Sequence, residues 1–378
     1  MSTRTNSPKS PSSGGRIWQT FKRQWAALLF LVALVVFPYA FAALTGESVN
    51  AGPPKFWQGQ LIIIFIMAVY AMSYDLLLGY TGILTFGHAA FFGGGAYTMG
   101  LFLAHVAPGI LKTYRISLPG GVDITEASLL LVAILLVLVV SVLLGLLFSA
   151  VSARVKGVYY AIITLAMAEA IHILSKATDF VKWTGADEGL HGVPVPAWIN
   201  PTQFRLRFYF VALIFAAAMY LITRRIVHSP TGRVFVGLRD NESRARMIGY
   251  NPALYRTVAF IVSAAIAGLA GGLYSLWTTS ATPSMTSALT TINALIMTIL
   301  GGMGTLIGPM LGAAVLELSG QFFYQWFGPR WPLVFGIIFI VLVMFLPYGI
   351  VGTWRLRSAQ WRQGWRRWLR IAKGTAGE

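Results

Sequence analysis

The sequence predicts an all-α membrane protein, a polytopic bundle of about ten transmembrane helices. Of its 378 residues, 56% are hydrophobic and only 11% are charged, whereas soluble domains carry about 25% charged residues. The hydrophobic residues form blocks of about 18 to 25 residues, such as 26–44 and 127–150, and a helix of that length crosses a bilayer. Too few polar side chains remain to cover a water-soluble globule.

Three regions are expected along the chain. Residues 1–17 are expected to be a disordered basic cytoplasmic arm, because their start is rich in Ser, Thr and Pro and lacks an apolar period. Residues 18–352 are expected to form the transmembrane domain, with 227–256 as a cytoplasmic segment, and residues 353–378 a basic cytoplasmic tail. Cleavage of a signal peptide near 40–42 is the less favoured alternative, because the first apolar block is long enough to span the membrane.

The apolar blocks delimit ten expected spans. In chain order they are residues 27–45, 60–79, 83–106, 127–150, 158–175, 208–226, 257–280, 288–300, 305–323 and 333–350. An even number agrees with both termini on the same side of the membrane. Ten spans divide into five and five, and an odd number in each half reverses the orientation of the second half. We therefore expect two inverted five-helix halves.

The positive charges predict the orientation, because Lys and Arg beside spans stay cytoplasmic. Residues 1–26 contain basic residues and no acid, and the tail contains several basic residues against Glu378 alone. Residues 227–256 are also basic, whereas the loop 176–207 carries balanced charges. Both termini and the 227–256 segment are therefore expected inside. The net charge of +17 indicates anionic lipids as partners of the tail, and no nucleic-acid-binding motif accompanies it.

The most unusual stretch is residues 79–98, where glycine recurs at membrane depth. Two compatible interpretations remain open. Small residues let helices pack closely, and a glycine-interrupted helix frees backbone groups that are tolerated where they line a substrate path. His88 lies in this stretch, as a hydrogen-bonded structural residue or as a residue of the path. No metal is expected there, because no second ligand lies at ligand spacing.

Three acidic residues lie inside apolar blocks, and each is expected to be buried and paired with a neighbouring donor. They are Asp75, Glu169 and Glu317. An intramembrane enzyme is disfavoured, because the chain has no cysteine and no His-Glu-x2-His zinc pair. No catalytic residue is therefore expected. A passive channel, which conducts without an energy source, is another alternative.

The segment 229–252 is predicted to contain a short amphipathic helix. The residues expected on its apolar stripe are Val234, Leu238, Ala245 and Ile248. Gly249 and Pro252 are expected to end it. An interfacial helix that lies on lipid headgroups is one interpretation. Docking to a soluble partner explains the mixed charges better, because a lipid-seeking face would carry arginines without acids.

Five motifs in order resemble the LivM-type permeases of branched-chain amino-acid ATP-binding-cassette importers, over about residues 60–350. The motifs are Gly-Tyr-Thr-Gly-Ile-Leu-Thr-Phe-Gly-His-Ala-Ala-Phe-Phe from 79, Trp-Thr-Gly-Ala-Asp-Glu-Gly-Leu-His-Gly-Val-Pro from 183, Gly-Arg-x5-Arg-Asp-Asn-Glu from 232, Ser-Ala-Ala-Ile-Ala-Gly-Leu-Ala-Gly-Gly-Leu-Tyr from 263 and Leu-Gly-Gly-Met-Gly-Thr from 300. Departures are modest. Thr85 stands where the family often has Ser, and 93–95 is richer in glycine than usual.

The resemblance implies a multi-pass permease subunit of the bacterial inner membrane, in an ATP-driven importer of branched-chain, hydrophobic amino acids. It implies as partners a second, LivH-like permease, two ATP-binding subunits and a periplasmic substrate-binding protein. No cofactor is expected on this chain. It has no Gly-x4-Gly-Lys-Ser/Thr phosphate loop, so ATP and Mg belong to the ATP-binding subunits. An importer of urea or short amides is the alternative within transport.

The resemblance also implies roles for two sets of residues. Those expected near the translocation path are Gly82, Thr85, Phe86, Gly87, His88, Phe91 and Phe92. Those expected to couple the chain to the ATPase are Gly232, Arg233, Leu238, Arg239, Asp240, Asn241, Glu242, Ala245 and Gly249. We call 232–249 the predicted coupling segment.

Overall fold

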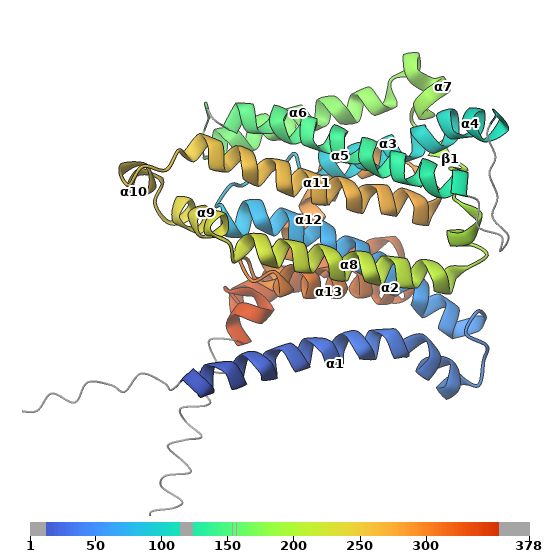
Figure 1. The fold of residues 1–378 in the computed structure, drawn as a ribbon, viewed down its shortest axis with the longest axis horizontal. Helices are drawn as coiled ribbons and strands as arrows, with labels where there is room; N and C mark the ends of the chain where they lie inside the picture. Colours follow the sequence, from blue (N-terminus) through green and yellow to red (C-terminus); the bar gives the residue numbers. More distant parts are fainter. Residues whose placement is uncertain (1–12, 114–123, 153, 156, 355–378) are drawn as a thin grey trace, which may run out of the picture. The chain divides into compact units, whose positions relative to one another are not determined.

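The structure is a computed structural model, and it describes residues 13–113, 124–152, 154–155 and 157–354. The described residues are predominantly helical (Figure 1). Their internal contacts divide the chain into two units, with the boundary between Gln58 and Gly59. The tail 355–378, with its expected lipid partners, and residues 1–12 of the arm lie outside the described residues.

The first unit consists of α1 (Ser13–Thr45) and the first turns of α2 (Gly52–Asp75). α1 begins inside the stretch expected to be a disordered arm, so residues 13–17 are helical. The side-chain amide of Gln58 donates a hydrogen bond to the carbonyl of Val49 at 2.7 Å. This bond joins the second helix to the turn that precedes it.

Among the described residues, the second unit contains the rest of α2 and twelve further α-helices, together with short turns and one strand pair. The α-helices are α3 (Ala89–Leu101), α4 (Ala107–Thr113), α5 (Ile124–Ser152), α6 (Val158–Lys176), α7 (Val181–Thr184), α8 (Arg205–Val227), α9 (Pro230–Asp240), α10 (Glu242–Met247), α11 (Pro252–Thr278), α12 (Ala288–Gly301), α13 (Ile307–Phe327) and α14 (Trp331–Phe345). The π-helical turns are η1 (Leu76–Tyr80) and η2 (Phe102–Val106), and the 3-10 turns are η3 (Thr178–Phe180), η4 (Ala197–Ile199), η5 (Pro283–Thr286) and η6 (Gly328–Arg330). The strands are β1 (Leu190–His191) and β2 (Ser280–Ala281).

Within the described residues, seven helical stretches are long and apolar enough to cross a membrane. They are Gly52–Tyr80, Ala89–Lys112, Thr125–Ser152, Val158–Lys176, Arg205–Val227, Pro252–Thr278 and Ile307–Trp354. Two shorter apolar helical stretches are Leu29–Thr45 and Ala288–Gly301. The predicted all-α polytopic fold is therefore confirmed, whereas the count of ten spans and the inverted halves stay predictions.

The helical bundle of the second unit has two distinguishable ends (Figure 1). α9 and α10 lie at one end, and α4, α7 and β1 lie at the other. At that second end β1 pairs antiparallel with β2, with Leu190 opposite Ala281. The basic segment 227–256 and the balanced loop 176–207 thus lie at opposite ends, as the predicted topology requires.

The helix expected over 83–106 begins later than expected, at Ala89. α2 continues as a π-helical turn to Tyr80, and the chain then runs without helical structure until α3. Gly82 has φ +74°, a conformation that disfavours other residues and ends the helix. The freed backbone groups find side-chain partners, since the N–H of Phe86 donates to Thr164 Oγ1 at 3.2 Å. The expected start of this span at 83 was therefore too early, and the glycine-rich stretch does contain a break in helical structure.

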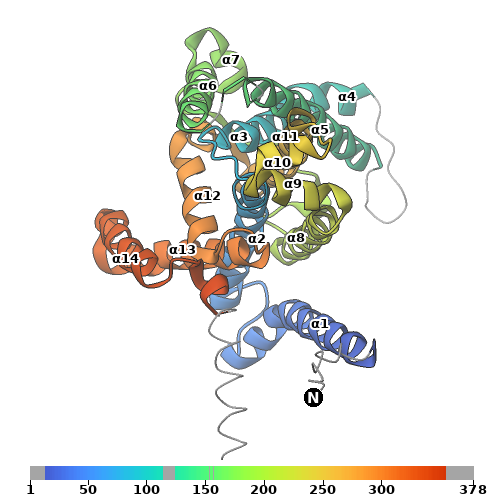
Figure 2. The same cartoon turned by 90° about the vertical axis from the view of Figure 1, so that its left-hand side faces the viewer.

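α3 packs among α5, α11 and α6 (Figure 2). Glycines on both α3 and α11 make this possible. A Cβ on Gly95 would collide with the backbone of Gly268, and a Cβ on Gly271 would collide with the carbonyl of Phe92. In lipid, no hydrophobic effect drives helices together. Small residues let the backbones approach, and the resulting van der Waals contacts hold the helices to each other. The small-residue packing predicted for this stretch is confirmed.

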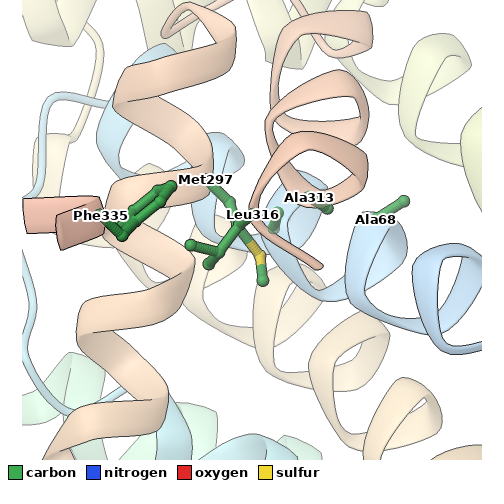
Figure 3. Close-up of a cluster of buried hydrophobic side chains, with 6 residues drawn as sticks. Ala68, Met297, Ala313, Leu316 and Phe335 are labelled. Atoms are coloured by element: carbon green, nitrogen blue, oxygen red, sulfur yellow. The ribbon is translucent and has the colours of Figure 1, made fainter. Parts of the chain in front are cut away.

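A second core joins α2, α12, α13 and α14 (Figure 3). Its buried members include Ala68, Met297, Ala313, Leu316 and Phe335. The two alanines leave room for the larger side chains, so that four helices meet in one cluster.

Large apolar side chains lie exposed on the outer face of α5. They include Leu131, Leu135, Leu143 and Leu147, each more than half exposed. Such a continuous apolar surface is unfavourable in water. It suits a helix that faces hydrocarbon, and the length of α5 matches the thickness of a bilayer.

Candidate functional site

The predicted coupling segment consists of two helices rather than one. Ser229 caps α9, because its hydroxyl accepts a hydrogen bond from the N–H of Gly232 at 3.3 Å. Asn241 has extended backbone, and its side chain accepts from the N–H of Arg244 at 2.9 Å, so that it starts α10. Asn side chains compete for backbone donors and favour caps over helix interiors. The single helix of the prediction is therefore broken at Asn241.

Three of the four residues expected on the apolar stripe are buried together. Val234, Leu238 and Ala245 form one cluster, against which Tyr255 of α11 packs. Ile248 is 70% exposed, and its place on the stripe was wrong, because α10 ends at Met247. Pro252 was also wrongly expected to end the helix, since it occupies the first position of α11, where its missing N–H costs nothing.

Glu242 holds the two short helices against the bundle. Its carboxylate lies 2.7 Å from the guanidinium of Arg256 on α11 and 3.3 Å from that of Arg246. The side chains of Glu242 and Arg256 are 19% and 17% exposed. A partly buried, charge-assisted pair of this kind is stronger than a surface ion pair. Glu242, predicted to act in coupling, thus bonds within its own chain.

A hydrogen-bonded junction joins the end of α9, within the coupling segment, to two distant turns. Arg239 donates a hydrogen bond to the carbonyl of Gly79. One turn earlier, the buried carboxylate of Asp75 accepts hydrogen bonds from the N–H groups of Gly304 at 2.7 Å and Leu306 at 3.4 Å. We call these five residues the Asp75–Arg239 junction. It connects α9, the end of α2 and the turn between α12 and α13.

The junction touches the start of the glycine-rich stretch directly. A Cβ on Gly82 would lie 2.7 Å from Cγ of Arg239. The absence of a side chain at this position is therefore required for the close approach of Arg239. The coupling segment therefore lies beside Gly82, the first residue of the predicted path. The two motifs are far apart in the sequence, so this contact could not be predicted from it.

The outer surface of the coupling segment carries charged and apolar groups. Arg233, Asp240 and Gly249 are exposed, and so are Met247, at 80%, and Ile248. Sequence reasoning missed Met247, although its position just beyond the charged residues was visible. An exposed patch of this composition is typical of a surface that binds another protein.

His88 lies in the interior of the bundle. Its side chain is fully buried, with Nε2 2.8 Å from the hydroxyl of Ser73. Aromatic rings enclose it: Tyr70 stacks on it at 5.3 Å, while Tyr74 and Phe91 approach edge-on at 5.1 Å and 5.4 Å between ring centres. This environment favours the structural interpretation of His88.

The other predicted path residues divide by burial. Thr85, Gly87, Phe91 and Phe92 are buried, whereas Gly82 is exposed and Phe86 is half-buried. They belong to the packed centre of the bundle. The ring of Phe91 packs on Phe148 at 5.0 Å and that of Phe92 on Tyr70 at 4.6 Å. Gly82 and Phe86 thus remain the accessible members of the set.

The three acids differ in their surroundings. Asp75 is buried and bonded, as predicted. Glu169 is exposed, so the expectation that it is buried was wrong, because it lies on the outer face of α6. Glu317 is half-buried beside Tyr274. Among the described residues no group of three or more His, Cys, Asp or Glu side chains is placed to hold a metal ion.

Comparisons with known proteins identify relatives among transport permeases. The family model described as the permease component of the branched-chain amino acid transport system matches residues 58–346. The chain is 25% identical to the high-affinity branched-chain amino acid transport permease LivM of Salmonella typhimurium, over 88% of this chain and 77% of that protein. It is also 25% identical to the LivM protein of Escherichia coli, over 85% of this chain and 74% of that protein.

A third relative is similar to this chain in length. The chain is 26% identical to the probable branched-chain amino acid transport permease LivM of Methanocaldococcus jannaschii, over 86% of this chain and 91% of that protein. No solved structure matches the chain significantly.

Proposed function

Because the chain belongs to the family of permease components of branched-chain amino acid transport systems, we propose that it is the membrane-spanning subunit of an ATP-driven importer of these amino acids. In this function it contributes to the translocation path and transmits movement from separate ATP-binding subunits. A LivH-like second permease and a periplasmic binding protein complete the importer. Both chain termini lie in the cytoplasm.

The observation that carries this proposal is the Asp75–Arg239 junction. The exposed patch on α9 and α10 supplies a surface for a soluble partner, and Arg239 links that surface to the backbone of Gly79. Asp75 extends the link to Gly304. Force applied to the coupling segment therefore reaches α2, α12 and α13 through hydrogen bonds and without a flexible linker.

The proposed mechanism follows from this geometry. Closure of the ATP-binding subunits moves α9 and α10, and the junction passes the movement to the turn 81–88 between η1 and α3. That turn lacks helical structure, so its backbone can change conformation at lower cost than a continuous helix. Gly82 and Phe86, the accessible members of the predicted path set, contact substrate as the path opens.

Hydrolysis itself is assigned to the partners. The sequence contains no phosphate-binding Gly-x4-Gly-Lys-Ser/Thr loop, in which backbone N–H groups and a lysine hold the nucleotide phosphates. ATP and Mg are therefore bound by the ATP-binding subunits. This chain contributes no catalytic group and binds no cofactor in the proposed mechanism.

The test replaces Arg239 and Asp240 together by alanine in the complete importer, reconstituted in vesicles with its binding protein. We expect ATP-driven leucine uptake to fall by about ten-fold or more, within the range of typical coupling free energies, while hydrolysis continues. The control is Arg225→Ala, which removes an exposed arginine at the end of α8, outside the coupling segment. Normal uptake and normal stimulation of hydrolysis in the double variant would refute the coupling assignment. Competition by urea instead of leucine would refute the substrate class.

A further inference from the structure

An exposed carboxylate lies within the membrane-spanning length of α6. Glu169 is exposed, and it lies about two turns before Lys176, the last residue of this helix. Among the residues that the structure describes, the other exposed charged side chains of the apolar spans lie at or near helix ends, as Lys112 and Arg225 do. Glu169 is therefore the charge whose place on the surface needs an explanation.

The residues that follow Glu169 indicate that it lies inside the apolar layer. Ile173, one turn further along α6, is 62% exposed, and the turn after the helix carries the exposed rings of Phe180 and Trp183. Aromatic side chains, Trp above all, favour the boundary between lipid and water. That boundary therefore lies past the end of α6. The short side chain of Glu169, about two turns deeper, does not reach it.

The surroundings of Glu169 on the helix surface are apolar. Ile162 and Leu165, on the same side of α6, are 57% and 37% exposed. We call Ile162, Leu165, Glu169 and Ile173 the Glu169 face. Within the described part of the chain, the Glu169 carboxylate has neither a hydrogen bond nor an ion pair. A charge that faces hydrocarbon is costly, and charged residues inside spans face protein or a water-filled cavity. Contact of this face with lipid is therefore unfavourable.

The neighbouring helix α5 provides a contrast. The exposed residues along its middle are large and apolar, such as Leu135, Leu143 and Leu147, whereas the hydroxyl-bearing Ser141 and Ser149 are buried. A face of this composition suits hydrocarbon. Since α5 and α6 contact each other in the same bundle, the charge on α6 indicates that the outer faces of the two helices have different neighbours.

The side of α6 that carries Glu169 borders η5 and α12. His172, three residues after Glu169 and so on the same side of the helix, lies with Nδ1 3.0 Å from the hydroxyl of Thr286 in η5. α12 follows η5 and contacts α6 (Figure 2). α12 also exposes an amide in its middle turns, at Asn293, beside Ile292, which is 37% exposed. Two neighbouring helices thus expose polar groups at membrane depth, which indicates a surface that another protein covers.

We propose that the Glu169 face binds a second, different membrane-spanning chain, which places a cationic or hydrogen-bond-donating side chain against the carboxylate of Glu169. The inference rests on the proposed function, in which a second permease subunit takes part, and it names the surface that this subunit covers. A second copy of this chain does not fit. A two-fold contact centred on this face would bring two Glu169 carboxylates together, and like charges at one site disfavour each other's ionised form. A chain that presents a donor satisfies the carboxylate and buries Ile162, Leu165 and Ile173.

The test uses the complete importer in vesicles, with p-benzoylphenylalanine in place of Ile173 on the Glu169 face. The matched control carries the same photoreactive residue in place of Leu143 on α5, which is 59% exposed. After irradiation we expect mass spectrometry to find position 173 joined to the second membrane subunit and position 143 joined to phospholipid alone. If position 173 reacts with lipid alone, with a second copy of this chain or with nothing, the proposal is overturned. Leucine uptake is measured in the same vesicles. Cross-linking does not depend on the substrate, so loss of uptake in the unmodified importer counts against the proposed function alone.

Substitution of Glu169 tests the charge itself. Glu169→Leu removes the carboxylate and keeps an apolar side chain on the surface. If the residue faced lipid, this change would favour insertion and leave assembly unaltered. We expect instead that association with the second membrane subunit weakens by about ten-fold or more, because the donor on the partner loses its buried acceptor. The measurement is the dissociation of the purified importer in detergent.

Two further variants complete this experiment. Glu169→Gln keeps an accepting oxygen and is expected to dissociate at an intermediate rate. Leu143→Ala, on the outer face of α5, is expected to leave association unchanged. Unchanged or tighter association of Glu169→Leu would contradict the proposal.

Discussion

Asp75 shows how a carboxylate is tolerated at membrane depth. The residue is fully buried, and its two oxygens accept hydrogen bonds from the N–H groups of Gly304 and Leu306. Gly79, one turn later, is required there, since a Cβ at that position would collide with Asp75 Oδ1. The sequence predicted that Asp75 would find a donor. It did not indicate that the donors are backbone groups of a turn that lies far along the chain.

Asp75→Asn tests this arrangement. The amide keeps one accepting oxygen but turns an NH2 group toward the second N–H, so one buried donor loses its partner. We expect the free energy of unfolding to fall by about 1–3 kcal/mol, measured by thermal unfolding of the complex in detergent. Asp187→Asn is the control, because its side chain is 81% exposed and its pair with Lys176 is loose, at 3.6 Å. Equal effects of both changes would contradict the proposed role of Asp75.

His88→Leu separates the two interpretations of this histidine. The substitution keeps an apolar side chain among the aromatic rings and removes the bond to Ser73. We expect a loss of about 1–3 kcal/mol of stability, with uptake per folded complex retained, because the ring is enclosed. His105→Leu, at an exposed histidine, is expected to change neither quantity. Loss of uptake at unchanged stability would instead place His88 in the path.

At the scale of single elements, the coupling segment illustrates a limit of periodicity. The apolar stripe correctly grouped Val234, Leu238 and Ala245, because side chains at helical spacing share a face. Asn241 nevertheless divides the segment, and its cap places Ile248 outside the helix. A cap residue within an amphipathic pattern was the signal that would have predicted two helices.

Gly95→Ala tests the close packing of α3 on α11. A methyl group at this position collides with the backbone of Gly268, which has no flexible end that can move aside. We expect destabilisation by about 1–3 kcal/mol or more, seen as a lower unfolding temperature of the complex. Gly336→Ala is the matched control, because nothing lies within 4 Å of its added Cβ. A gain in helix propensity should make it neutral or slightly stabilising.

At the scale of the whole molecule, the two ends of the bundle predict its topology. The chain has no cysteine, so single cysteines can be placed at Met247, near the coupling segment, and at Asp187, in the loop at the other end. We expect a membrane-impermeant maleimide to label Met247→Cys only in inside-out vesicles and Asp187→Cys only in right-side-out vesicles. Labelling of both from the same side would show that the predicted orientation is wrong.

The sequence by itself determined the class of this protein. An apolar block longer than about 18 residues is most stable as a helix in lipid, because a helix satisfies its own backbone hydrogen bonds. Five motifs in order predicted the family that the comparison over residues 58–346 confirmed. Helix packing through glycine was predictable from composition alone. These features depend on the order of residues within short segments, which does not change when the chain folds.

Only the tertiary structure decided which segments meet. Hydrogen bonds join residues far apart in the chain, as between Arg239 and Gly79 and between Asp75 and Gly304. The hydropathy pattern does not indicate such pairs. In lipid, helices associate through shape and hydrogen bonds that depend on both partners at once. Each apolar block therefore determines its own insertion into the membrane. The contacts of the Asp75–Arg239 junction, in contrast, form only after the blocks have packed.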